Sequence, residues 1–123
     1  MNKDAVLKYI TSNNHIGIKA GTERDSFLEI WMVIVEDRIF ARSWGFAERS
    51  WFNTFLKNPF GEIKCGDEIF KIKAEIPEQG EGLMEKINDA YLEKYTSTEH
   101  NKKYAEGIIK DAHIEKTMEF IVL

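Results

Sequence analysis

The chain has 123 residues, of which 43% are hydrophobic and 31% charged, and its formal net charge is -4 at pH 7. A chain of this size builds one domain around a single core, so we expect residues 1–123 to fold as one unit. Acidic and basic residues are interspersed and form no sustained basic face, which argues against nucleic acid as a partner. The longest apolar run, residues 30–35, is far shorter than the roughly 20 residues that cross a bilayer, so no membrane partner is expected.

The cellular location is predicted from the cysteine content and the N-terminus. Cys65 is the only cysteine and forms no internal disulfide, which suits a reducing compartment and the role of a small buried strand residue. Charged residues interrupt the first eight positions, so they do not form the apolar segment of a secretory signal. We therefore expect a cytoplasmic protein.

A short helix is expected first, because Val6, Leu7 and Ile10 recur at helical spacing. Asp4 is a suitable cap for it, and Asn13-Asn14 would end it. This helix leads into a weakly alternating strand at residues 15–20 and a polar turn.

Residues 27–35 are almost all apolar, apart from Glu29, which is typical of a strand covered on both faces. We expect this strand at the centre of the sheet. Glu36-Asp37 is expected to turn the chain into a second strand at residues 39–44, although it lacks the glycine that a positive φ favours. That pairing would place Glu29 near Ser43 or Trp44.

The second half of the chain predicts a helix, a hairpin, two more helices and a closing strand. Asn58-Pro59 would end the first helix, and Gly66-Asp67 would turn the hairpin of residues 60–65 and 68–76. The closing strand is expected at 113–123. The inner faces of the three helices are expected to be formed by Trp51, Phe52, Phe55 and Leu56, by Leu83, Ile87, Tyr91 and Tyr95, and by Tyr104 and Ile108. This order of elements is typical of an α+β fold.

Several segments resemble an uncharacterised bacterial family, the domain-of-unknown-function family 2255. The resemblance runs in the same order through Trp31–Val35, Arg42–Gly45, Trp51-Phe52, Gly61–Gly66 and Asp89–Tyr95. Residues 55–59 also resemble the helix end of deazaflavin-dependent nitroreductases and of the wider flavin-binding split-barrel group.

The wider resemblance implies a split β-barrel with peripheral helices, which pairs as a homodimer. It also implies a flavin such as FMN, or a deazaflavin, in a groove between the subunits. In an oxidoreductase of this kind the cofactor performs hydride transfer, and no protein side chain needs to be catalytic.

Five residues around the break at Gly45 are candidates for binding such a cofactor: Arg42, Ser43, Arg49, Ser50 and Trp51. A nucleotide phosphate needs cationic forks and hydroxyl or backbone donors, which the two Arg and two Ser residues offer. The indole of Trp51 would supply a flat stacking face for the flavin ring.

Each candidate also has a structural alternative. Ser50 would cap the helix that begins at Trp51, Arg49 would be a solvated surface charge, and Trp51 would pack in the core. Arg42 lies on a predicted strand, where a charge needs a partner, and Glu29 is an alternative to phosphate for that role.

No catalytic residue and no metal ligand is predicted. His15, His100 and His113 are too scattered for a metal spacing, and Cys65 has no histidine near it in sequence. The sequence therefore leaves a second function open, namely a non-catalytic dimeric module that binds another small ligand or a protein.

Overall fold

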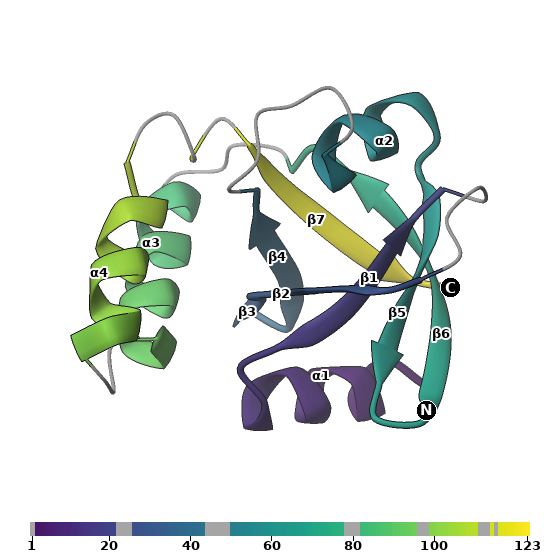
Figure 1. Cartoon of the computed structure of the whole chain (residues 1–123), viewed down its shortest axis with the longest axis horizontal. Coiled ribbons are helices and arrows are strands. Elements are labelled where there is room, and N and C mark those ends of the chain that lie inside the picture. Colours follow the sequence, from purple (N-terminus) through teal and green to yellow (C-terminus); the bar gives the residue numbers. More distant parts are fainter. Residues whose placement is uncertain are drawn as a thin grey trace.

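The computed structural model describes residues 2–21, 26–43, 50–77, 82–95, 99–110, 114 and 116–123. Within these residues an antiparallel sheet of seven strands, in the order β2-β1-β5-β6-β7-β4-β3, curls into a half-barrel (Figure 1). The α+β class is therefore confirmed. The elements are α1 (Asn2–Ser12), β1 (Ile16–Ala20), β2 (Leu28–Ile30), β3 (Val33–Val35), β4 (Arg38–Arg42), α2 (Trp51–Lys57), β5 (Phe60–Cys65), β6 (Glu68–Glu75), α3 (Leu83–Tyr95), α4 (Glu99–Ile108) and β7 (Thr117–Val122).

The apolar segment 27–35 is not one central strand, and that prediction is wrong. The ladder is interrupted at Trp31-Met32, which separates β2 from β3, and these two strands lie at opposite edges of the sheet. Only two residues join them, so the chain itself connects the two edges. We call Trp31-Met32 the seam. An apolar run does not distinguish one buried strand from two short edge strands that pack on different layers.

The turn after the seam matches the prediction. Glu36 and Asp37 both have positive φ, at 54° and 62°, as a two-residue hairpin of this hand requires. β3 and β4 pair around them, with Val35 opposite Arg38 and Val33 opposite Phe40. Glu29 does not join this ladder, because the seam moves it into β2, where it lies opposite Gly17 of β1.

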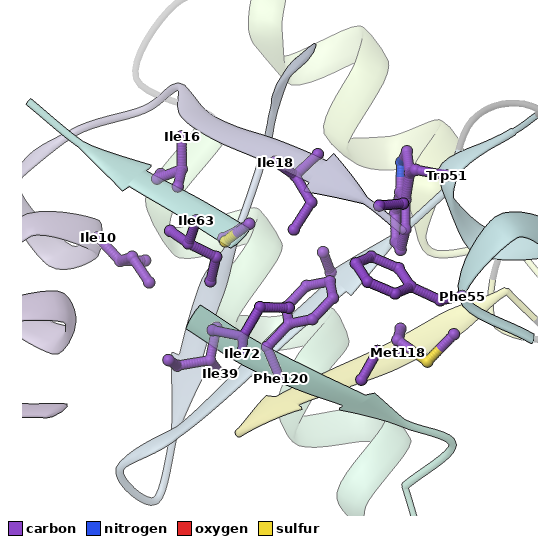
Figure 2. Packing of buried hydrophobic residues seen from close by; sticks show 14 of the residues in the cluster. Ile10, Ile16, Ile18, Ile39, Trp51, Phe55, Ile63, Ile72, Met118 and Phe120 are labelled. Carbon is purple, nitrogen blue, oxygen red and sulfur yellow. The ribbon is translucent and has the colours of Figure 1, made fainter. Parts of the chain in front are cut away.

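The interior of the half-barrel is filled by one apolar cluster. Alternate residues of the strands point into it, and Ile16, Ile63 and Ile72 are fully buried. Figure 2 shows Ile10 of α1 and Phe55 of α2 meeting these strand residues. α1 and α2 therefore cover the interior rather than the outer surface of the sheet.

The two remaining helices, α3 and α4, cover a different surface. They pack on the outer side of β3 and β4, where Val33, Val35 and Phe40 are buried in a second apolar cluster. The inner face predicted for α3 is confirmed, since Leu83, Ile87, Tyr91 and Tyr95 are all buried. In Figure 1, α3 and α4 lie on one side of the barrel, and β5 and β6 lie on the opposite side.

Several local predictions need correction. Leu56 of α2 is 56% exposed and Tyr104 of α4 is 46% exposed, so neither belongs to an inner face. Ala105 packs together with Ile108 instead, because these two positions are three residues apart and share one helix face. Asp4 lies in the first turn of α1 rather than at its cap, since the helix already includes Asn2.

The hairpin of β5 and β6 is confirmed. The closing strand β7 is confirmed in a shorter form than residues 113–123, because it begins at Thr117 and Ile114 is helical. Gly66 has φ +65° in the β5–β6 turn, as the Gly66-Asp67 pair predicts. β7 pairs with β6 on one side and with β4 on the other. Among the helices that the structure describes, none combines the length and the apolar character needed to span a membrane.

Candidate functional site

Arg42 is the most unusual residue of the predicted site, because its guanidinium is buried under α3 and α4. Its exposed fraction is 3%. Phe40 and Arg42 have the same parity on β4, so both side chains point outward, whereas Ile39 and Ala41 point into the half-barrel. Its position on β4 therefore places the Arg42 cation between the sheet and the helices α3 and α4.

The guanidinium is held by neutral acceptors from three different elements. Its Nε donates to Thr117 Oγ1 at 3.0 Å, and Nη1 donates to Asn88 Oδ1. Weaker contacts reach the carbonyl oxygens of Ile108 at 3.4 Å and Met84 at 3.3 Å. Because Ile108 is the last residue of α4, its carbonyl lies at the negative end of the helix dipole.

No carboxylate pairs with Arg42 in the ion pairs found among the described residues. The alternative pairing with Glu29 is therefore wrong, and the seam explains why, since Glu29 belongs to β2. Arg38, four residues earlier on the same face of β4, differs from Arg42 because it forms a bidentate pair with Glu119 at 2.8 and 3.0 Å. Burial lowers the pKa of Arg42 to about 10, which still leaves it charged at neutral pH.

Tyr91 and Tyr95 extend this polar layer along α3. Tyr91 Oη accepts the Arg42 backbone N–H at 2.8 Å, and burial raises the pKa of Tyr91. Tyr95 Oη accepts the Met32 backbone N–H at 3.1 Å and donates to the Asn14 carbonyl at 2.6 Å. The two hydroxyls therefore accept backbone N–H groups that carbonyl oxygens would accept in an uninterrupted strand ladder.

Lys94 completes the attachment of α3 to the seam. Its Nζ donates to the Met32 carbonyl at 2.7 Å and to the Ile10 carbonyl at 2.6 Å, so one ammonium joins α1, α3 and the seam. Burial lowers the pKa of Lys94 to about 8. The Trp31 ring stacks on the Tyr95 ring with centroids 4.1 Å apart and planes 6° from parallel.

The sequence reasoning missed Lys94, Asn88 and Thr117. The sequence does hold one indication of a polar contact: two tyrosines, Tyr91 and Tyr95, occur in the otherwise aliphatic buried face of α3. A buried phenol needs a hydrogen-bond partner, so this face marked a surface that meets polar backbone.

The other predicted site residues have structural contacts of their own. Ser50 caps α2, and its Oγ accepts the Asn53 N–H at 3.3 Å. Trp51 is 5% exposed and packs against Phe55 and Phe120 in the interior cluster. Ser43 is buried, and its backbone N–H donates to the Lys116 carbonyl at 3.2 Å. Arg49 lies outside the described residues.

The structure does not bring the five predicted residues into one described cluster. Arg42 points outward toward α3, whereas Trp51 points into the half-barrel, so the two side chains lie on opposite sides of the sheet. The cap at Ser50 and the core role of Trp51 match the structural alternatives of the sequence analysis. Their role in binding a cofactor stays a prediction.

The single cysteine is poorly suited to nucleophilic chemistry. Cys65 is buried, and burial raises the pKa of its thiol to about 11, which makes it a poor nucleophile at neutral pH. Within the described part of the chain, no three His, Cys, Asp or Glu side chains are grouped so that they could hold a metal ion.

The chain resembles a solved structure in its fold and a family model in its sequence. No curated protein matches it. Among solved structures, the crystal structure of the conserved hypothetical protein Rv2991 from Mycobacterium tuberculosis matches with a TM-score of 0.59 and 13% sequence identity. The match covers 98% of this chain and 78% of that protein, and at this identity it concerns the fold alone.

A family model described as "Uncharacterized protein conserved in bacteria" matches residues 7–120, which include all the described strands except the last two residues of β7 and most of the helical residues described above. Arg42 and its hydrogen-bond partners, the seam and nearly all of the interior cluster lie within the matched region. The chain therefore belongs to the bacterial family DUF2255.

Proposed function

We propose that this protein binds a flavin or deazaflavin nucleotide in a groove between two copies of the chain. In this proposal the cofactor carries hydride chemistry, and the protein positions it and the substrate. The proposal combines the resemblance of residues 55–59 to the flavin-binding split-barrel group with one structural observation, namely that the interior of the half-barrel is already filled.

The filled interior limits where a ligand can bind. Small barrels that hold a ligand inside need an open cavity. Here Ile18, Ile63, Ile72 and Phe120 expose 2% or less of their surface, and Trp51 occupies the same cluster. A flavin would have to displace this core to enter, so an external groove supports the proposal better than an internal cavity.

The phosphate-binding role falls first to Arg49 under this proposal. Arg42 already uses its guanidinium to hold Thr117 and Asn88, and Ser50 uses its hydroxyl to cap α2. Arg42 would then act indirectly, by fixing the end of β4 from which the chain continues toward Arg49.

The second candidate function is a non-catalytic dimeric module that binds another small ligand or a protein. The structural roles of Arg42, Ser50 and Trp51 favour it, because three of the five predicted cofactor contacts are explained by the fold. This candidate needs no nucleotide site at all.

A titration distinguishes the two candidates. After an absorbance scan of the purified protein, FMN and a deazaflavin are each titrated up to about 100 µM, with fluorescence as the readout. We expect saturation at one site per subunit. Arg49→Ala should weaken binding roughly tenfold, since a charge-assisted hydrogen bond contributes about 1.5–3 kcal/mol.

Lys103→Ala is the matched control, because it removes an exposed cation of α4 and should leave the affinity unchanged. If neither cofactor binds the wild-type protein, the flavin proposal is rejected and the non-catalytic module becomes the better explanation. Equal affinity of wild type and Arg49→Ala would remove Arg49 from the site.

A further inference from the structure

One outer surface of the sheet is not covered by any described helix. It is formed by the outward residues of β5, β6 and β7, and we call it the outer β5–β7 face. Phe60 is 50% exposed, Ile69 52% and Ile121 38%. α1 and α2 pack into the interior cluster, and α3 and α4 pack on β3 and β4, so these apolar side chains face solvent.

The strand register makes this face continuous. Lys73 of β6 lies between Phe60 of β5 and Ile121 of β7, so the three form one row across the sheet. In the neighbouring rows Ile69 lies opposite Lys64, and Lys71 lies opposite Glu62. Apolar and charged side chains therefore alternate over a single surface.

The charges on this face have both signs. Lys19 pairs with Glu62 at 3.0 Å, and Lys73 approaches Glu75 at 3.7 Å with both side chains nearly half exposed. Two of the lysines are thus paired with glutamates, and the interspersed charges would resist burial in a lipid surface. A protein partner with the same mixture of lysine, glutamate and large apolar side chains fits this pattern.

The simplest partner of that kind is a second copy of the chain. A two-fold axis places the same patch on both sides of an interface, so the patch must complement itself. A patch that carries Lys73 and Glu75 side by side meets this requirement, because a two-fold rotation can set the lysine of one copy against the glutamate of the other.

An interface of ordinary size would cover only a small part of the chain's surface. A standard interface buries about 800 Å² on each partner, which is roughly a tenth of the 7493 Å² of accessible surface of the chain. Pairing through the sheet edges would be weaker, because the edge strands β2 and β3 have three residues each. A face-to-face contact of three strands offers more area than either edge.

We infer that the outer β5–β7 face binds a second copy of this chain around a two-fold axis. The inference deepens the proposed function, on which it rests for the need of a groove between two copies, by naming the surface that forms the pair. The ends of β5 and β7 would then lie at the rim of the interface.

Sedimentation velocity over a range of protein concentrations tests this inference. We expect the wild-type protein to be a dimer and the variants Phe60→Glu and Ile121→Glu to be monomers. Leu56→Glu is the matched control, because Leu56 is 56% exposed but belongs to α2, and it should remain a dimer. All substituted side chains are exposed, and a far-UV spectrum checks that each variant is folded.

Two results would overturn the inference. One is a wild-type protein that is monomeric at every concentration. The other is a Phe60→Glu or Ile121→Glu variant that dimerises as strongly as Leu56→Glu. A dimer that is lost in both variants but binds no flavin would reject the proposed cofactor and support the inference. A monomer that binds flavin would overturn the inference and place the cofactor site within one copy of the chain.

Discussion

Arg42 shows how a buried cation can be accommodated by neutral groups alone. Its hydrogen bonds reach Thr117 of β7, Asn88 of α3 and the end of α4, so a single side chain connects the sheet to both outer helices. Because every partner is a neutral acceptor, removal of the guanidinium would leave these oxygens without their donor, and those of Thr117 and Ile108 are buried.

We predict that Arg42→Ala lowers the free energy of unfolding by about 3 kcal/mol, since buried and half-buried acceptors lose their partner. Arg42→Lys should restore only part of this loss, because an ammonium cannot reproduce the planar fork. Urea unfolding followed by circular dichroism measures both. A loss for Arg42→Ala no greater than that of the exposed control Lys103→Ala would contradict the structural role.

Lys94 should make stability depend on pH. Burial lowers its folded pKa to about 8, below the ordinary value of 10.5, so the folded protein releases this proton before the unfolded chain does. The unfolded chain then holds more protons between these two values, and stability rises with pH in that window.

We expect the free energy of unfolding to rise between pH 8 and pH 9 in the wild type and to stay flat in Lys94→Met. Measurements stop at pH 9, the ordinary pKa of cysteine, because the raised pKa of Cys65 acts in the opposite direction above it. Denaturant titrations at several pH values give the slope. An unchanged slope in Lys94→Met would assign the rise to another group.

At the scale of elements, β1, β5 and α2 approach one another closely at Gly61. A Cβ placed on Gly61 would lie 2.4 Å from the Lys19 carbonyl oxygen and 2.8 Å from Phe55 Cε1. The first atom belongs to backbone within the ladder and the second to a buried ring of α2. Gly61 thus allows α2, β1 and β5 to approach one another.

We predict that Gly61→Ala lowers the melting temperature by several degrees, as expected from a loss of about 1–3 kcal/mol through overpacking. Gly17→Ala is a matched control in the same pair of strands, because its nearest neighbour would be the Lys64 Cβ at 3.1 Å rather than a backbone atom. If Gly61→Ala melted at the same temperature as Gly17→Ala, the backbone of β1 and β5 would have moved apart to accept the added Cβ.

Across the whole molecule, locally encoded features were predictable and long-range contacts were not. The β5–β6 hairpin follows from Gly66-Asp67, and the inner face of α3 follows from its period of about four residues. The sequence does not predict the division of segment 27–35 into β2 and β3, because both strands are rich in apolar residues.

The candidate site was less predictable for the same reason. The partners of Arg42 lie 42 to 75 residues away in sequence, and no local pattern indicates that Asn88 or Thr117 would meet it. The cap at Ser50 was foreseen because capping is a local interaction within one helix turn.

The position of β7 has a consequence for how the chain folds during synthesis. Thr117–Val122 separates β6 from β4 in the sheet, so before these residues leave the ribosome the strands form two unconnected groups, β2-β1-β5-β6 and β4-β3. The seam links the two groups covalently but cannot align them. Completion of the barrel must therefore wait for the last strand, and the exposed edges of β6 and β4 are open to wrong pairing until it arrives.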